Sequence, residues 1–246
     1  PQEMRMMTRI WIAAAAAALL AIGGAHAQAP AEHKMDGGHR TDGAKGHQMN
    51  PEGVFRHSFE GAEKWAEVFD DPARDAWQKP DEIVAALKLP KNALVADIGA
   101  GTGYFSARLA KSVPDGEIFA ADIEKDMVRY LGERAKREKL SNIVPVQSSA
   151  DSANLPRPVD LILLVDTYHH IVDRLDYFAK LRGSLKPGGR LAIVDFTAES
   201  PDGPPVAHRI PLDKATAELK AAGYERVESF GFLPRQYFAI FEKAAQ

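Results

Sequence analysis

The segment Val95–Phe105 constrains the fold more than any other part of this chain. It has the sequence VADIGAGTGYF, with glycines at Gly99, Gly101 and Gly103. A strand-like apolar run precedes the glycines, and a helical pattern begins at Tyr104. Alternating glycines let the backbone turn sharply and let a ligand lie against it without a Cβ in the way. Because ligands of open α/β sheets bind at the carboxyl ends of strands, the sequence predicts a ligand site at this loop.

Strand-like and helical patterns alternate along the rest of the chain, which predicts an α/β fold with an open, mostly parallel, doubly wound sheet. The expected strands are Ala93–Ile98, Glu117–Ala121, Ile143–Val146, Val159–Val165, Arg190–Phe196, Arg226–Phe230 and Tyr237–Glu242. The expected helices are Ala62–Phe69, Pro80–Leu89, Tyr104–Ser112, Met127–Lys139, Ile171–Leu185 and Leu212–Ala222.

The first 27 residues have the three parts of a secretory signal peptide. Arg5 and Arg9 give a basic start, Ile10–Gly24 is apolar, and Ala25–Ala27 is an A-x-A cleavage pattern. The apolar run is short for a membrane span, which needs about 20 residues. We therefore expect cleavage after Ala27, export to the bacterial periplasm and no stable membrane insertion afterwards. An uncleaved anchor or a buried helix is the alternative.

Residues 28–53 are rich in Gly, Ala, His, Lys and Asp, and such a composition favours a disordered linker. His33, His39 and His47 lie in it, and histidine-rich tracts can bind metal. Their spacing is loose, so we expect a solvated linker and no metal site. The folded domain is expected at residues 54–246.

Charge and cysteine content exclude several classes of function. The chain has 31 Lys and Arg against 34 Asp and Glu, a net charge of −3, which argues against a bulk nucleic-acid binder. It has no cysteine, which excludes disulfides, cysteine-ligated zinc and thiol nucleophiles.

The glycine loop does not fit a nicotinamide dinucleotide, whose fingerprint is Gly-x-Gly-x-x-Gly. Counted from Gly99 or from Gly101, the third position is Tyr104 or Ser106. Acidic residues instead follow three successive strands. Asp97 lies within the first, Asp122 follows the second and Asp151 follows the third. A carboxylate after the second strand can accept both ribose hydroxyls of an adenosyl group. We expect Ile123 to pack on adenine and Asp151 to accept from its amino group.

These residues resemble the class I S-adenosylmethionine-dependent methyltransferases, over about Asp81 to Glu242. Asp97 with the three glycines is similar to the first motif of that family, Asp122 to its ribose-binding acid, and Leu185–Leu191 to its turn into the fifth strand. The similarity is greatest to small-molecule enzymes of the quinone-biosynthesis type. The resemblance implies a seven-stranded Rossmann-like sheet of order 3-2-1-4-5-7-6, strand 7 antiparallel, with helices on both faces.

The resemblance also implies S-adenosyl-L-methionine as cofactor and a small-molecule methyl acceptor. The positions that we expect to contact the cofactor are Asp97, Gly99, Ala100, Gly101, Gly103, Tyr104, Asp122, Ile123, Ala150, Asp151, Asp166, Trp77 and Gln78. Trp77 and Gln78 would do so from an N-terminal segment that covers the pocket in the family. A core anchor is the alternative for Trp77.

Candidates for the chemistry follow the fourth strand, in Asp166-Thr167-Tyr168-His169-His170. His169 or His170, with Tyr168, are the catalytic candidates, because a histidine can act as base near neutral pH. The alternative is that one histidine caps the next helix and the other is merely exposed. His208 and Arg209 follow a Pro- and Gly-rich loop and are candidates for acceptor binding, or an ordinary surface pair. Adjacent histidines rarely converge on one ion, so we expect no metal here.

Two functions remain open from the sequence. The first is methyl transfer by in-line displacement at the sulfonium methyl. The second is an exported protein that binds S-adenosylmethionine or a nucleoside without turnover, because nothing in the sequence explains how a cytosolic cofactor reaches an exported protein. Oligomeric state is not predicted.

Overall fold

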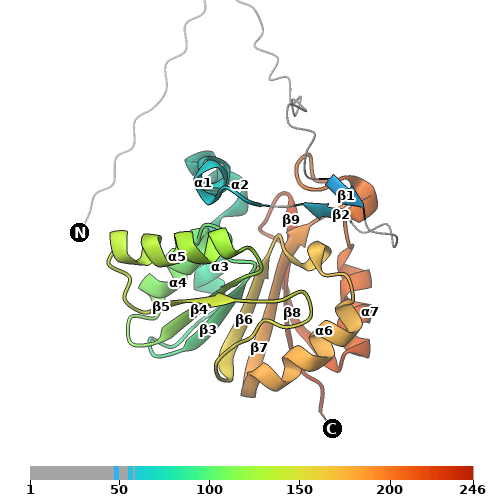
Figure 1. Ribbon diagram of the computed structural model, residues 1–246. Coiled ribbons are helices and arrows are strands. Elements are labelled where there is room, and N and C mark those ends of the chain that lie inside the picture. The colour runs from blue at the N-terminus through green and yellow to red at the C-terminus, as the bar shows by residue number, and fades with distance from the viewer. Residues whose placement is uncertain (1–46, 50–54, 58, 246) are drawn as a thin grey trace, which may run out of the picture. The chain divides into compact units, whose positions relative to one another are not determined.

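The computed structural model describes residues 47–49, 55–57 and 59–245, and a seven-stranded mixed sheet forms its centre (Figure 1). The strands are β3 (Leu94–Ile98), β4 (Glu117–Asp122), β5 (Ile143–Gln147), β6 (Val159–Val165), β7 (Leu185–Phe196), β8 (Tyr224–Phe230) and β9 (Gln236–Lys243). Their order is β5-β4-β3-β6-β7-β9-β8. β9 runs antiparallel to both neighbours, and all other pairs are parallel. This order confirms the predicted topology.

Helices cover both faces of the sheet, as the sequence predicts. They are α1 (Ala62–Phe69), α2 (Asp75–Gln78), α3 (Pro80–Ala86), α4 (Tyr104–Ser112), α5 (Lys125–Arg137), α6 (Arg174–Leu181) and α7 (Leu212–Ala221). Ile83, Leu109 and Leu131 place α3, α4 and α5 in one buried cluster, and Phe178 and Leu219 place α6 and α7 in the other. Each face of β6 therefore meets apolar side chains, which explains its nearly continuous apolar sequence, interrupted only by Asp160.

The predicted helix Ile171–Leu185 is wrong at both ends. A short 3-10 helix, η2 (Tyr168–His170), precedes it, and α6 begins at Arg174 after Asp173, whose side chain accepts from the Asp176 N–H. An acidic N-cap of this kind fixes the start of a helix. At the other end, β7 begins already at Leu185, because Leu185 pairs with Val159 of β6 ahead of a bulge.

A short strand pair lies at the end of the predicted linker. There β1 (His47–Met49) pairs antiparallel with β2 (Phe55–His57). Such a pair is held by backbone hydrogen bonds, which a judgement from apolar composition does not count. The predicted signal peptide and the rest of the linker lie outside the described residues. No described helix is long and apolar enough to cross a membrane.

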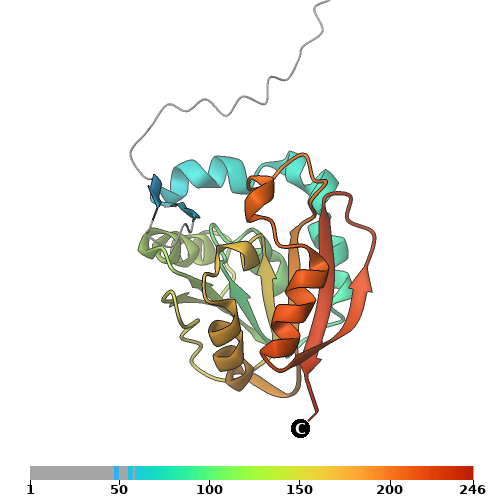
Figure 2. The same ribbon diagram turned by 90° about the vertical axis from the view of Figure 1, so that its right-hand side faces the viewer.

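Both ribbon views place α1 and α2 above one end of the sheet, together with the loop that contains the short helix η4 (Val206–His208) (Figure 2). This is the end at which the glycine loop follows β3, because Phe69 of α1 lies beside Gly101. The carboxyl edge of the parallel strands is therefore the edge that these segments cover.

The turn into β4 gives a test of the sheet geometry. A Cβ on Gly116 would lie 2.0 Å from the Ala93 carbonyl oxygen, a backbone atom that cannot move aside. We expect Gly116→Ala to lower the free energy of unfolding by about 1–3 kcal/mol, as overpacking does. Gly183→Ala is the control, because a Cβ there meets nothing within 4 Å. Equal urea midpoints for the two variants would contradict the predicted clash.

Candidate functional site

The glycine loop has backbone conformations that favour glycine, and at Gly99 its surroundings leave no room for a side chain. Its three glycines all have positive φ, of 73°, 54° and 89°. The N–H of Gly99 donates to the Ala121 carbonyl of β4 at 2.8 Å. A Cβ on Gly99 would lie 2.2 Å from the Thr167 Oγ1, beyond β6. The loop is thus held between the ends of the two strands that flank β3.

Asp122, the last residue of β4, is buried and faces this loop. One carboxylate oxygen accepts the Gly101 N–H at 2.8 Å, and the other accepts the Glu124 N–H at 2.9 Å. Burial raises the pKa of Asp122, and these two hydrogen bonds oppose that rise. A carboxylate has about four lone-pair sites, so Asp122 retains capacity to accept two hydroxyl groups.

Beside Asp122, the side chain of Ile123 is 51% exposed, which is unusual for an isoleucine next to a buried strand. It lines an open pocket of about 540 Å³ together with Glu60, Glu124, Lys125 and Asp126. An apolar surface next to a hydroxyl-binding carboxylate suits a nucleoside, whose base and ribose need these two kinds of contact.

Asp97 lies within β3 and is 3% exposed. Its carboxylate accepts the Ser106 hydroxyl of α4 at 2.6 Å. Burial raises the pKa of Asp97 to about 6, the Ser106 hydrogen bond lowers it, and the Asp122 charge raises it further. A cation bound near Asp97 would lower this pKa again.

Ala150 and Asp151 are exposed, in the loop after β5. Asp151 accepts the Ser149 hydroxyl at 2.7 Å, and this hydrogen bond lowers the pKa of Asp151. The Ser148 N–H donates to the Asp122 carbonyl at 2.9 Å, so the loop begins beside Asp122. The adenine contacts predicted for this pair stay a prediction.

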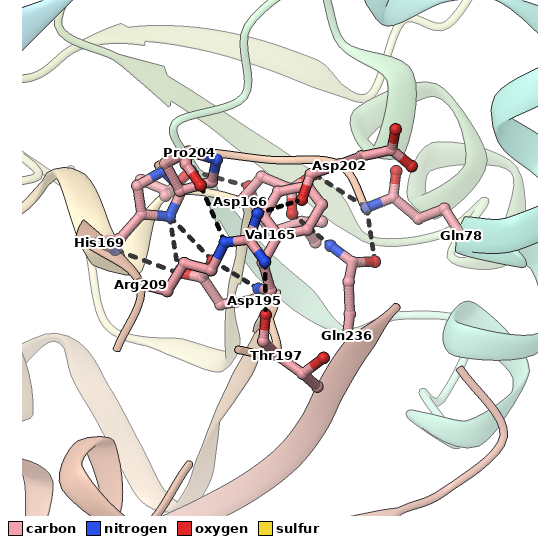
Figure 3. Close-up of polar contacts among 12 residues, drawn as sticks. Gln78, Val165, Asp166, His169, Asp195, Thr197, Asp202, Pro204, Arg209 and Gln236 are labelled. Atoms are coloured by element: carbon pink, nitrogen blue, oxygen red, sulfur yellow. Dashed lines mark hydrogen bonds and ion pairs between the residues drawn. The ribbon is translucent and has the colours of Figure 1, made fainter. Parts of the chain in front are cut away.

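Asp166 follows β6 with a φ of 54°, and three side chains surround it, of which Figure 3 labels Gln78 and Gln236. Its carboxylate accepts from Arg74 at 3.1 Å, from Gln78 at 3.0 Å and from Gln236 of β9. Burial raises the pKa of Asp166 to about 6, and the Arg74 charge opposes this. Asp166 therefore fastens the segment before α3 onto the sheet, and its oxygens are already engaged by protein donors.

Gln78, Trp77 and Tyr104 have partners of their own. Gln78 is fully buried and also donates to the Gln236 side-chain oxygen at 3.1 Å. The Trp77 ring lies 6.1 Å from that of Phe196, in the arrangement expected of a packing residue. The Tyr104 hydroxyl donates to Asp75. These contacts fix the three side chains, and their roles toward a cofactor stay predictions.

His169 is paired with a carboxylate that the sequence analysis did not single out. Its Nδ1 lies 2.8 Å and 3.0 Å from the two oxygens of Asp195, near the end of β7 (Figure 3). The two side chains are 6% and 2% exposed. The His170 ring lies 4.1 Å from that of His169. Within the described part of the chain no group of three His, Asp, Glu or Cys side chains is arranged to hold a metal.

The structure does not support the catalytic role predicted for Tyr168. Its ring is fully buried against Phe178, with ring centroids 5.2 Å apart. Its hydroxyl donates to Glu218 of α7 at 2.8 Å, and burial raises its pKa. The side chain points into the core because residue 168 opens a 3-10 helix, which turns His169 and Tyr168 in different directions.

Arg209 binds the backbone of its own loop (Figure 3). Its guanidinium donates to five carbonyl oxygens, those of Thr197, Ala198, Ser200, Asp202 and Pro204. These bonds engage Nε, Nη1 and one N–H of Nη2 within the loop, and the acceptor-binding role of Arg209 stays a prediction. Its neighbour His208 is half-buried in η4, and the acceptor role of His208 stays a prediction.

Residues 59–78, called here the N-terminal cover, attach to the loop after β4 and to α5. The Asp126 carboxylate accepts the Ala62 N–H at 2.7 Å and the Gly61 N–H at 3.1 Å. Arg134 pairs with Asp70 at 2.8 Å. These contacts place the start and the end of α1 across the glycine loop.

The underside of the N-terminal cover is aromatic. A Cβ on Gly101 would lie 3.5 Å from the Phe69 ring. Trp65 stacks on Phe69 at 5.3 Å, and Phe59 lies 5.8 Å from both Phe69 and His170. The cluster therefore extends from the glycine loop to His170 of η2.

Asp195 and Gln236 are the site residues that sequence reasoning missed. Asp195 had a signal, because it is a carboxylate inside the apolar strand sequence LAIVDF, as Asp97 is in LVADI. A buried carboxylate needs hydrogen-bond partners, so the argument that marks Asp97 as a site residue marks Asp195 as well. Gln236 had no comparable signal, since its partner Asp166 is distant in the chain.

An open sheet of this order, with a glycine loop after its first core strand and an acid after the second, defines the class I S-adenosylmethionine-dependent methyltransferases. Residues 95–189 match the family model for a methyltransferase domain. The fold and this match together support the assignment of the chain to that class.

Individual relatives agree with this assignment. The chain is 30% identical over 106 residues to the ubiquinone/menaquinone biosynthesis C-methyltransferase of Pasteurella multocida, covering 42% of this chain and 40% of that one. It is 29% identical over 161 residues to the 27-O-demethylrifamycin SV methyltransferase of Amycolatopsis mediterranei, covering 59% and 58%. The chain thus spans about half the length of these relatives.

Solved structures resemble the whole domain. An S-adenosylmethionine-dependent methyltransferase from Aquifex aeolicus aligns with a TM-score of 0.68 and 25% identity, over 73% of this chain and 97% of that one. The cofactor of this class is S-adenosylmethionine, and the residues present fit it. Asp122 has acceptor capacity for ribose hydroxyls, Ile123 offers an apolar surface, and the three glycines of the loop carry no Cβ that would stand between a ligand and their backbone.

The raised pKa of Asp97 predicts a pH dependence of stability. The unfolded pKa is near 3.8 and the folded pKa about 6, so the folded state binds this proton more tightly. The resulting stabilisation is complete below pH 4 and is lost as the pH rises through 6. Between pH 4 and 7, we expect the wild type to lose on the order of 2 kcal/mol of unfolding free energy relative to Asp97→Asn. A pH-independent difference between the two urea titrations would contradict this prediction.

Proposed function

We propose that this chain binds S-adenosylmethionine at the carboxyl edge of its sheet and transfers the methyl group to a small-molecule acceptor. The observation that carries the proposal is Asp122, a buried carboxylate that is held by the Gly101 and Glu124 N–H groups with lone pairs to spare. Two ribose hydroxyls are suited to this arrangement, and few other ligands present such a pair beside an apolar ring.

The residues of the chain would mainly bind and orient. When bound, S-adenosylmethionine supplies a methyl group that is already electrophilic because it is attached to a sulfonium. Asp122 would hold the ribose, Ile123 the base, and Asp97 the charged end through its field. The aromatic underside of the N-terminal cover would exclude water. Such positioning is worth about 7–11 kcal/mol of the barrier in well-aligned reactions.

The acceptor would lie next to the cofactor, over the ends of β6 and β7. Phe196, His169 and His170 lie there, below the N-terminal cover. The names of the two curated relatives indicate a quinone precursor and a rifamycin. A small organic acceptor is therefore our proposal for this chain as well. A macromolecule is less suited to a crevice that the aromatic cluster spans.

Binding without turnover is the second candidate, and the predicted signal peptide motivates it. Formation of S-adenosylhomocysteine from S-adenosylmethionine in the presence of acceptors distinguishes the two. Tight binding with no product from any acceptor would favour the binding protein.

Asp122→Ala tests the cofactor site. Hydrogen bonds to a charged group are worth about 1.5–3 kcal/mol each, and about 1.4 kcal/mol is tenfold in affinity. We expect the dissociation constant for S-adenosylhomocysteine, measured by calorimetry, to rise at least tenfold. Asp115→Ala is the matched control, because Asp115 is exposed in the turn before β4. Unchanged affinity in Asp122→Ala would remove the main support for the site.

Export is also a proposal. We expect a Gram-negative host to release a chain that begins at Gln28 into its periplasm, because Ala25 and Ala27 fit the cleavage pattern. Mass spectrometry of the periplasmic fraction measures the new terminus, and Ala27→Arg is the control that should block cleavage. Recovery of only uncleaved chain from the wild type would contradict cleavage.

A further inference from the structure

The carboxylate of Asp195 is buried and accepts hydrogen bonds on both of its oxygens. It lies on β7 with 2% of its side chain exposed. One oxygen accepts the Phe196 N–H at 2.7 Å, and the other accepts the His169 N–H at 3.1 Å. Each of these bonds uses a lone pair of the carboxylate. With two backbone donors and a ring nitrogen around it, Asp195 can rotate very little.

This arrangement fixes the protonation of the neutral His169 ring. The Nδ1 atom faces both Asp195 oxygens, at 2.8 Å and 3.0 Å. A carboxylate is only an acceptor, so Nδ1 must carry the proton. The lone pair of the neutral ring is then on Nε2, the nitrogen that a base needs. The backbone N–H and the ring of His169 bind the same carboxylate, so backbone and ring are positioned together.

The ring lies near the carboxyl edge of the sheet. Only two residues, Asp166 and Thr167, separate the end of β6 from η2, at the edge where the glycine loop lies. A positive charge on His169 lowers the pKa of Asp166, so the two groups are within electrostatic reach. The His170 ring beside it contacts Phe59 of the N-terminal cover. His169 is therefore under the cover, near the place proposed for the acceptor.

The two carboxylates of this region disfavour a cationic acceptor. Asp166 is engaged by Arg74, Gln78 and Gln236, and Asp195 by His169 and two backbone N–H groups. Neither retains a clear capacity to pair with an ammonium group. The neighbouring rings of Phe196, Phe59 and Trp77 favour an uncharged, largely apolar molecule.

We propose that Asp195 is a positioning residue that holds His169 as the proton acceptor of the reaction, and that the methyl acceptor is a neutral molecule with a weakly acidic O–H group. The inference rests on the proposed methyl transfer. The acceptor proton passes to Nε2 of His169, and an acceptor electron pair forms the new bond to the methyl carbon. The carbon–sulfur bond breaks with its electron pair remaining on sulfur, which leaves neutral S-adenosylhomocysteine. The imidazolium that results is stabilised by Asp195.

The first test needs no acceptor. Two-bond ¹H–¹⁵N correlation spectra of the histidine rings distinguish Nδ1–H from Nε2–H, and His169→Gln identifies the signal among the eight histidines. We expect the Nδ1–H form in the wild type. In Asp195→Asn one amide oxygen cannot replace two carboxylate oxygens, so we expect loss of that form. An Nε2–H ring in the wild type would overturn the proposal.

The second test measures methyl transfer from labelled S-adenosylmethionine to catechol, benzylamine and thioanisole. These probes are a neutral O–H acid, an ammonium ion and a group that has no proton to lose. We expect transfer to catechol, with kcat reduced about 10²-fold or more in His169→Gln and Asp195→Asn and little change in KM, since a general base contributes about 10²–10⁴-fold. Asp173→Asn, an exposed helix cap, is the matched control.

The affinity for S-adenosylhomocysteine distinguishes a failure of this inference from a failure of the proposed function. Affinity within twofold of wild type in all three variants shows that only chemistry has changed. A wild-type rate in His169→Gln, preferred transfer to benzylamine or thioanisole, or no transfer to any probe by a protein that binds S-adenosylhomocysteine would each overturn the inference. If S-adenosylhomocysteine does not bind at all, the proposed function fails instead, and the ring spectra still decide the role of Asp195.

Discussion

Burying a carboxylate costs free energy unless N–H or O–H groups replace the water that it loses. Four buried or partly buried carboxylates at the carboxyl edge of this sheet have such donors. The four central strands bring Asp97, Asp122, Asp166 and Asp195 to the carboxyl edge of the sheet, within or directly after a strand. The donors come from α4, the glycine loop, the N-terminal cover and η2. The hydrogen bonds that these acids accept therefore position the segments around the carboxyl edge of the sheet.

The hydrogen bonds that each acid already accepts determine what it can still offer a ligand. Asp122 is bonded on each oxygen by one N–H and can still accept, whereas Asp166 is surrounded by three side chains. Asp122 is therefore suited to binding a ligand, and Asp166 to holding segments of the chain together. Asp166 joins β6 to β9 and to the residues before α3, and so it connects the N-terminal cover to the sheet.

The sequence predicts the sheet order, the glycine loop and the ribose acid, because strands and loop motifs are local patterns and a glycine with positive φ has few substitutes. The bounds of α1 and α4 agree with the prediction for the same reason. The acceptor side could not be predicted equally well. Tyr168 and His169 are neighbours in sequence, yet one enters the core and the other the crevice, and only the turn of η2 decides which. The partners of Asp166 and of Arg209 depend on tertiary contacts that no local pattern records.

The hydrogen bonds from Arg209 to its loop affect which substitutions that loop can accept. Its guanidinium binds five carbonyl oxygens, and every residue type offers a carbonyl at its position. The path of residues 197–204 therefore depends on Arg209 and on Gly203, whose φ is 96° and where a Cβ would lie 2.6 Å from the Phe196 ring, more than on the other side chains along it. Substitutions in this loop alter the surface beside Phe196 while its backbone stays in place. Such a loop is a natural region for exchanging one acceptor preference for another without refolding the domain.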